Sequence, residues 1–126
     1  MSKERPLSPH LLIYRPQLTS MMSICHRISG AALAGGSLLL VWWIVGLASG
    51  PEYFGFVQKI MTSLPGQIVL FGFTAAVFYH LCNGIRHLCW DFGYGLSIEG
   101  VYRGGWMVLL MAVLLTLGLW ALILTG

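Results

Sequence analysis

Charge is the scarcest property of this 126-residue chain, because only 9% of its residues are charged whereas 57% are hydrophobic. The mean hydropathy is +0.80, far more apolar than an ordinary soluble domain. We therefore predict that most of the chain lies in a lipid bilayer. At roughly 20 apolar residues per bilayer crossing, three crossings use about half of the chain and leave no room for a separate soluble domain. We expect residues 1–126 to form one membrane domain.

Several sequence patterns are also missing. The three cysteines, Cys25, Cys82 and Cys89, have no CxxC spacing, so we predict buried free thiols and neither a disulfide framework nor an iron-sulfur site. The chain has no GxGxxG fingerprint of a dinucleotide site. Its N-terminus does not resemble a signal peptide, because mostly polar residues precede the first long apolar run, and we expect the first span to be retained.

The few charges are distributed asymmetrically. A net charge of +3 arises from seven Lys or Arg against four Asp or Glu. Six of the seven basic residues precede the first apolar run or flank the second connection, whereas Lys59 lies in the first connection. The positive-inside rule therefore predicts that the N-terminus and the second connection face the cytoplasm, or the matrix of a mitochondrion. A nucleic-acid interface would gather such charges on one water-exposed face, so that class is rejected.

The apolar runs predict an all-α membrane protein with three transmembrane helices, preceded by a short N-terminal interfacial segment. The expected spans are about residues 22–48, 65–90 and 105–125. Residues 52–63 are expected to form an amphipathic connection on the outer side. Residues 91–105, rich in Gly, Tyr and charge, are expected to form the cytoplasmic connection.

The N-terminal segment, residues 1–20, contains three prolines and is not expected to form a long helix. Its apolar insert at residues 11–14 is too short to cross a bilayer and is expected in the headgroup layer, with Tyr14 at the boundary. Thr19 or Ser20 is the expected cap of the first span. Pro65 is acceptable in the first turn of the second span.

One ionisable side chain, His80, lies well inside a predicted span. Such a residue is costly in lipid and functional by default, and imidazole is a common ligand of haem iron, so we interpret His80 as an axial haem ligand. Gly84, four residues later, leaves a groove beside it for a macrocycle. The alternative is a neutral His80 bonded to a carbonyl of a neighbouring helix. His87 is instead expected to pair with Asp91 at the interface.

A second group of polar residues is predicted at the cytoplasmic end of the first span. Ser23, His26, Arg27 and Gly30 fall at i, i+3, i+4 and i+7, so they share one helical face. A hydroxyl, an imidazole and a guanidinium would converge there. The alternative for this face is a snorkelling Arg27 with a capping Ser23.

Four motifs occur in order along the chain: RPLSPHL at 5–11, IYRP at 13–16, SICHRISG at 23–30, and His80 followed by GIRHL at 84–88. Taken together, they resemble the family of succinate dehydrogenase cytochrome b556 subunits, the larger membrane-anchor subunits of respiratory complex II. The resemblance implies a heterotetramer. In that assembly a flavoprotein oxidises succinate, an iron-sulfur protein passes electrons on, and two small membrane subunits hold haem b and reduce ubiquinone.

The resemblance also implies roles for individual residues. The histidine at the position of His80 is one axial ligand of haem b in that family, and the second anchor subunit supplies the other. Ser23 and Arg27 match residues that line the ubiquinone site, and His26 and Arg27 lie near the haem propionates. The set expected to contact the cofactor is His26, Arg27, Gly30 and Gly84. The expected location is the bacterial inner membrane, or the mitochondrial equivalent, with a cytoplasmic N-terminus and a periplasmic C-terminus.

Other functions stay open at this point. The anchor of a fumarate reductase shares this architecture. That enzyme runs the succinate/fumarate couple in reverse, and the sequence does not fix the direction of the reaction. A haem-free subunit for proton relay or transport, in which His80 carries protons, belongs to a different class. A third alternative is a tether that only docks the soluble subunits, and the number of copies in the assembly is left open.

Overall fold

The computed structural model describes residues 4–12 and 15–126, and within these ranges all regular structure is helical. One 3-10 turn, η1 (Pro9–Leu12), precedes four α-helices. They are α1 (Leu18–Ala48), α2 (Pro51–Thr62), α3 (Leu64–Asp91) and α4 (Ile98–Thr125). Helices α1, α3 and α4 are long and apolar enough to cross a membrane. The predicted class, three membrane helices after a short N-terminal segment, is confirmed.

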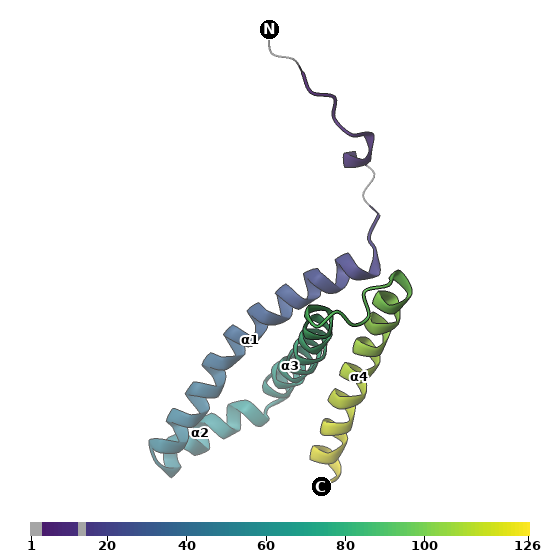
Figure 1. Cartoon of the computed structure of the whole chain (residues 1–126). Coiled ribbons are helices and arrows are strands. Elements are labelled where there is room, and N and C mark those ends of the chain that lie inside the picture. Colours follow the sequence, from purple (N-terminus) through teal and green to yellow (C-terminus); the bar gives the residue numbers. More distant parts are fainter. Residues whose placement is uncertain (1–3, 13–14) are drawn as a thin grey trace.

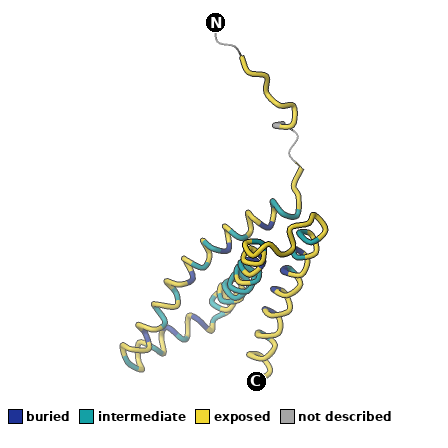
Figure 2. The backbone as a smooth tube through the Cα atoms, in the orientation of Figure 1, coloured by how far each residue is buried: buried dark blue, intermediate teal, exposed yellow. Residues whose placement is uncertain are grey.

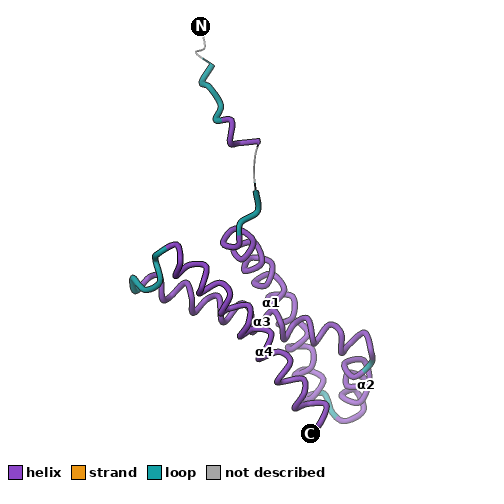
Figure 3. The backbone as a smooth tube through the Cα atoms, turned by 90° about the vertical axis from the view of Figure 1, so that its right-hand side faces the viewer, coloured by secondary structure: helices purple, strands orange, loops and turns teal. Residues whose placement is uncertain are grey.

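The three long helices form a bundle in which α3 packs against both α1 and α4 (Figures 1 and 3). The short helix α2 crosses one end of the bundle, where the C-terminus also lies; we call this the α2 end. The beginning of α1 and the connection from α3 to α4 lie at the opposite end, which we call the α3–α4 end. Residues 4–12 extend away from the bundle there.

The long helices exceed the thickness of a bilayer core. With 31 residues in α1 and 28 in each of α3 and α4, they are about 46 and 42 Å long, against about 30 Å of hydrocarbon. Their ends therefore reach the headgroup layers. This places the first turns of α1, which carry several of the predicted site residues, close to water.

The helix boundaries differ from prediction at the start of α1. This helix begins at Leu18 after Gln17, whose side chain makes no capping hydrogen bond, so the expected cap at Thr19 or Ser20 is wrong. Helix α3 begins as predicted, with Pro65 in its first turn. Tyr14, predicted at the membrane boundary, lies outside the described residues.

The second connection is shorter than predicted, because α4 begins at Ile98 and not near residue 105. The Ser97 side chain accepts a hydrogen bond from the Gly100 backbone N–H, which caps the helix. Arg103 then pairs with Glu99 one turn away, at 2.6 Å. These polar residues extend the helix beyond its apolar run and leave residues 92–97 as the connection.

Most residues of the long helices are exposed and only a few are buried (Figure 2). Close helix contacts are made at glycines: Gly36 of α1 lies against the Phe73 ring of α3, and Gly46 of α1 lies against Val57 of α2. Small residues allow this approach where lipid supplies no hydrophobic driving force between helices. The large exposed apolar surface is what three helices that cross a lipid bilayer are expected to present.

The thiols are less buried than predicted. Cys25 and Cys89 are exposed on this chain, and Cys82 is half-buried. The expectation of three buried thiols is therefore wrong for the chain by itself, because no described helix of this chain covers Cys25 of α1 or Cys89 of α3.

Candidate functional site

His80 points from α3 toward α1, where its Nδ1 atom lies between two oxygens. Nδ1 is 3.0 Å from the Ser29 hydroxyl and 3.2 Å from the His26 carbonyl oxygen. The Ser29 hydroxyl itself donates to that carbonyl, at 2.8 Å. A carbonyl has no hydrogen to give, so both contacts are explained if Nδ1 carries the proton and donates it. Nε2 then holds a lone pair in the neutral ring.

Three imidazoles gather at this position. The rings of His26 and His80 stack with centroids 4.0 Å apart and planes inclined by 8°, and the His87 ring lies 5.4 Å from His26. The rings of His87 and Trp90 also form a T-shaped pair with centroids 4.9 Å apart, and no ion pair joins His87 to Asp91 within the described residues. The predicted His87–Asp91 pair is therefore wrong, because the ring turns toward α1.

The surroundings of His80 fit a ligand bound at Nε2. An imidazole lone pair points outward in the ring plane, so a ring stacked on the face of His80 does not occupy that direction. Gly84 has open space where a Cβ atom would lie, and the neighbouring Leu81 is exposed. A single imidazole supplies one ligand, and the described ranges contain no group of three or more His, Cys, Asp or Glu that could hold a metal ion.

The alternative interpretation of His80 is partly realised. Nδ1 does contact a carbonyl of a neighbouring helix, that of His26. This contact uses one ring nitrogen only, and Nε2 makes no hydrogen bond within the described part of the chain. A metal-ligating histidine typically has the same arrangement, with its other nitrogen held by a carbonyl or carboxylate.

The predicted face of α1 divides into two parts. His26 and Gly30 face His80, and a Cβ atom at Gly30 would lie only 3.2 Å from the Cε1 atom of that ring. Gly30 therefore makes room for the imidazole. Ser23 and Arg27 are exposed, and their side chains make no hydrogen bond among the described residues. One buried atom of the site, Nδ1 of His26, also has no partner there.

Sequence reasoning missed the residue that orients His80. Ser29 is buried, and its hydroxyl is the nearer partner of Nδ1. The available signal was a hydroxyl inside an apolar run, next to Gly30. A hydrogen bond between α1 and α3 was also not predicted from the sequence: the Tyr79 hydroxyl donates to the Met22 carbonyl at 2.7 Å.

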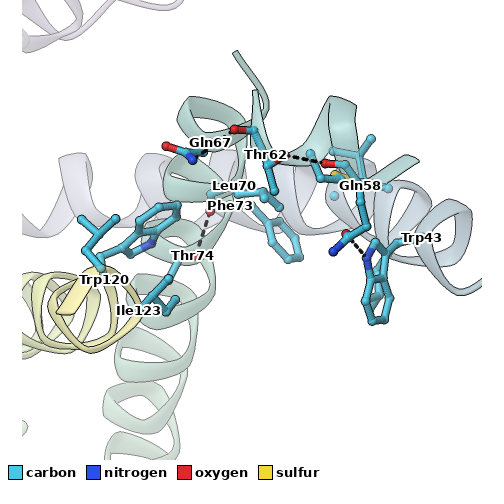
Figure 4. A pocket seen from close by; sticks show the side chains of 14 residues that line it. Trp43, Gln58, Thr62, Gln67, Leu70, Phe73, Thr74, Trp120 and Ile123 are labelled. Carbon is cyan, nitrogen blue, oxygen red and sulfur yellow. Dashed lines mark hydrogen bonds between the residues drawn. The ribbon is translucent and has the colours of Figure 1, made fainter. Parts of the chain in front are cut away.

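A separate cavity of about 490 Å³ lies at the α2 end (Figure 4). In Figure 4, Trp43 and the Gln58 side chain to which it donates a hydrogen bond lie on one side of the cavity, and Trp120 of α4 lies on the other. The walls are mainly apolar, and His80 is not among the residues that line them. This cavity is thus distinct from the imidazole cluster.

Comparisons with known proteins give a consistent result. A family model described as succinate dehydrogenase/fumarate reductase transmembrane subunit matches residues 1–119. The succinate dehydrogenase cytochrome b556 subunit of Rickettsia typhi is 45% identical over 117 residues, covering 93% of this chain and 91% of that protein.

Two further relatives give similar matches. The cytochrome b556 subunit of Paracoccus denitrificans is 41% identical over 111 residues, or 88% of this chain and 85% of its own length. The mitochondrial cytochrome b560 subunit of Homo sapiens is 40% identical over 124 residues, covering 97% of this chain and 73% of that protein.

Proposed function

Because this chain belongs to the succinate dehydrogenase/fumarate reductase transmembrane subunit family, we propose that it anchors a succinate:ubiquinone oxidoreductase, respiratory complex II. Its partners are a flavoprotein, an iron-sulfur protein and a second membrane anchor. The chain does no succinate chemistry itself. It lies in the bacterial inner membrane, or its mitochondrial equivalent, with the α3–α4 end facing the cytoplasm.

The orientation of His80 is the observation that carries this proposal. Ser29 and the His26 carbonyl hold its Nδ1 atom, and Nε2 keeps an unshared lone pair within a membrane helix. We assign His80 as one axial ligand of haem b, with the other ligand from the second anchor. A bound haem b supplies one-electron redox chemistry. Because Gly84 has no side chain, the surface of α3 is open where the macrocycle would lie.

The neighbouring residues suit the charged edge of that cofactor. Haem propionates are anionic and need donors or cations near them. We assign His26 and Arg27 to this role. Nδ1 of His26 is buried and has no hydrogen-bond partner among the described residues, and Arg27, the next residue of α1, is exposed. Gly30 belongs to the site through its contact with the His80 ring, which it allows to approach α1.

Ser23 and Arg27 are assigned to the ubiquinone site. They lie one turn apart on α1, at the end that reaches the headgroup layer, and both are exposed. A quinone carbonyl gains negative charge as it is reduced, so a hydroxyl and a permanently charged guanidinium stabilise that change and orient the ring. Water at this end of the bundle supplies the protons for the quinol.

A redox difference spectrum of the purified assembly tests the haem assignment. His80→Ala should abolish or weaken the reduced α band, because it removes an axial ligand, whereas His87→Ala should retain the band. Equal spectra for wild type and His80→Ala would refute the assignment. A pigment-free assembly with full quinone reductase activity would support a haem-free anchor instead.

Activity measurements test the quinone site and the direction of turnover. Ser23→Ala and Arg27→Ala should impair ubiquinone reduction while succinate oxidation by an artificial acceptor is unchanged. Unchanged ubiquinone reduction in both variants would indicate a tether that only docks the soluble subunits. Faster fumarate reduction by quinol than succinate oxidation by quinone would identify the assembly as a fumarate reductase.

A further inference from the structure

A second cavity, of about 380 Å³, lies between α3 and α4 at the α3–α4 end. Its walls include Cys82, Arg86 and Trp90 of α3 and Gly104, Met107 and Met111 of α4. Trp90 and Cys82 are eight residues apart on one helix, a distance of about 12 Å along the axis. The cavity therefore runs lengthwise from the headgroup layer toward the hydrocarbon core.

Arg86 brings an uncompensated charge into this cavity. The residue is only 7% exposed, and its guanidinium donates to the Val101 carbonyl at 2.9 Å and to Asn83 Oδ1 at 3.2 Å. It also contacts the Met22 sulfur and lies over the Trp90 ring. All of these partners are neutral, and no carboxylate within the described ranges lies within 4.0 Å of it. A buried charge without a counter-charge is costly, so an anion from outside the chain is expected.

The unused donors of Arg86 define the shape of that anion. The Arg86 guanidinium has five N–H donors. The single hydrogen of Nε has no partner among the described residues, and the two hydrogens of Nη2 make only one hydrogen bond. Nε and Nη2 share one edge of the group, the edge that forms paired bonds with phosphate or carboxylate. Gly104 lines the cavity beside this edge, since a Cβ atom there would lie 3.5 Å from the buried Nε, whereas Gly105 packs against Met22 and Leu18.

We propose that this cavity binds one membrane phospholipid, with its phosphate on Arg86 and an acyl chain along α3 and α4. A lipid fits better than a carboxylate of a partner protein, because the walls are mostly apolar and follow the helix axes. Arg86 lies five residues before the end of α3, which is headgroup depth. Exposed apolar side chains, Ile85 on α3 and Met107 on α4, continue the wall outward. The site does not depend on haem or on quinone.

Lipid binding to the assembly that contains the full chain tests the proposal. After exhaustive delipidation in detergent, the protein is titrated with phosphatidylglycerol dissolved in the same detergent, and retained phospholipid is counted by native mass spectrometry. Arg86→Gln should weaken binding of one phospholipid by about tenfold or more, the loss expected for a charge-assisted hydrogen bond. Arg103→Gln, which removes an exposed charge at the same end, should leave that binding unchanged.

A second variant keeps the test decisive if Arg86→Gln does not assemble. Gly104→Ala preserves the charge of Arg86 and its present hydrogen bonds, but places a methyl group 3.5 Å from Nε. It should weaken phospholipid binding without lowering thermal stability. Equal binding by wild type and Gly104→Ala, or by wild type and Arg86→Gln, would overturn the proposal. So would displacement of the lipid by millimolar inorganic phosphate, or a partner carboxylate bonded to Arg86 in a structure of the assembly.

Discussion

Replacing Ser29 by alanine should raise the midpoint potential of the haem that we assign to His80. The Ser29 hydroxyl is the nearer of two acceptors for Nδ1–H, at 3.0 Å against 3.2 Å for the His26 carbonyl. Donation from Nδ1–H makes the imidazole a stronger ligand and favours the more positive, oxidised iron. Removing the acceptor therefore favours the reduced state.

The size of the shift follows from the strength of one hydrogen bond between membrane helices. Such bonds average about 0.6 kcal/mol, with a maximum of about 1.7. For a one-electron couple, about 59 mV corresponds to a tenfold change in equilibrium constant, or about 1.4 kcal/mol. The expected rise is therefore about 25 mV, with about 70 mV as the limit. The lower value is favoured because the His26 carbonyl still accepts from Nδ1.

Ser37 provides a matched control for this experiment. Its hydroxyl donates to the Ala34 carbonyl three residues earlier, just as Ser29 donates to that of His26, but it does not contact His80. Potentiometric titration of the α band in Ser29→Ala and Ser37→Ala separates the contact with His80 from the local helix contact. A fall in potential, no shift for Ser29→Ala, or an equal shift for both variants would refute the reasoning.

Two further predictions concern stability, measured as the thermal denaturation of the purified assembly. Tyr79→Phe should cost about 1 kcal/mol, because it removes the hydrogen bond from α3 to an α1 carbonyl, whereas Tyr102→Phe, at an exposed position, should cost nothing. Gly36→Ala should cost about 1–3 kcal/mol, because its Cβ atom would overlap the Phe73 ring. The adjacent Gly35→Ala has open space and should be neutral or slightly stabilising. Equal melting within either pair would contradict the packing described.

Hydropathy was sufficient to predict three membrane helices, because a span needs only a long run of residues that lipid accepts. It was insufficient for the start of α4, where polar residues continue the helix beyond the membrane through the Ser97 cap and the Glu99–Arg103 pair. Residues 91–105 are rich in Gly and charge, which is typical of a connection between helices. The hydropathy pattern does not distinguish such a segment from the capped first turns of a helix.

The candidate site was predictable where it depended on spacing within one helix. Helical periodicity placed His26 and Gly30 on one face, and both now contact His80. Ser29 and Arg86 were missed because their roles depend on the register between helices. Ser29 lies 51 residues from His80, and Arg86 reaches the Val101 carbonyl of another helix. Local sequence patterns do not specify such register.

An experimental density map of the intact assembly tests the central claim most directly. The account predicts iron bound to Nε2 of His80, with Nδ1 still held by Ser29 and a macrocycle lying over Gly84. A map in which Nε2 faces lipid, or is hydrogen-bonded to another protein group with no macrocycle beside it, would contradict the account.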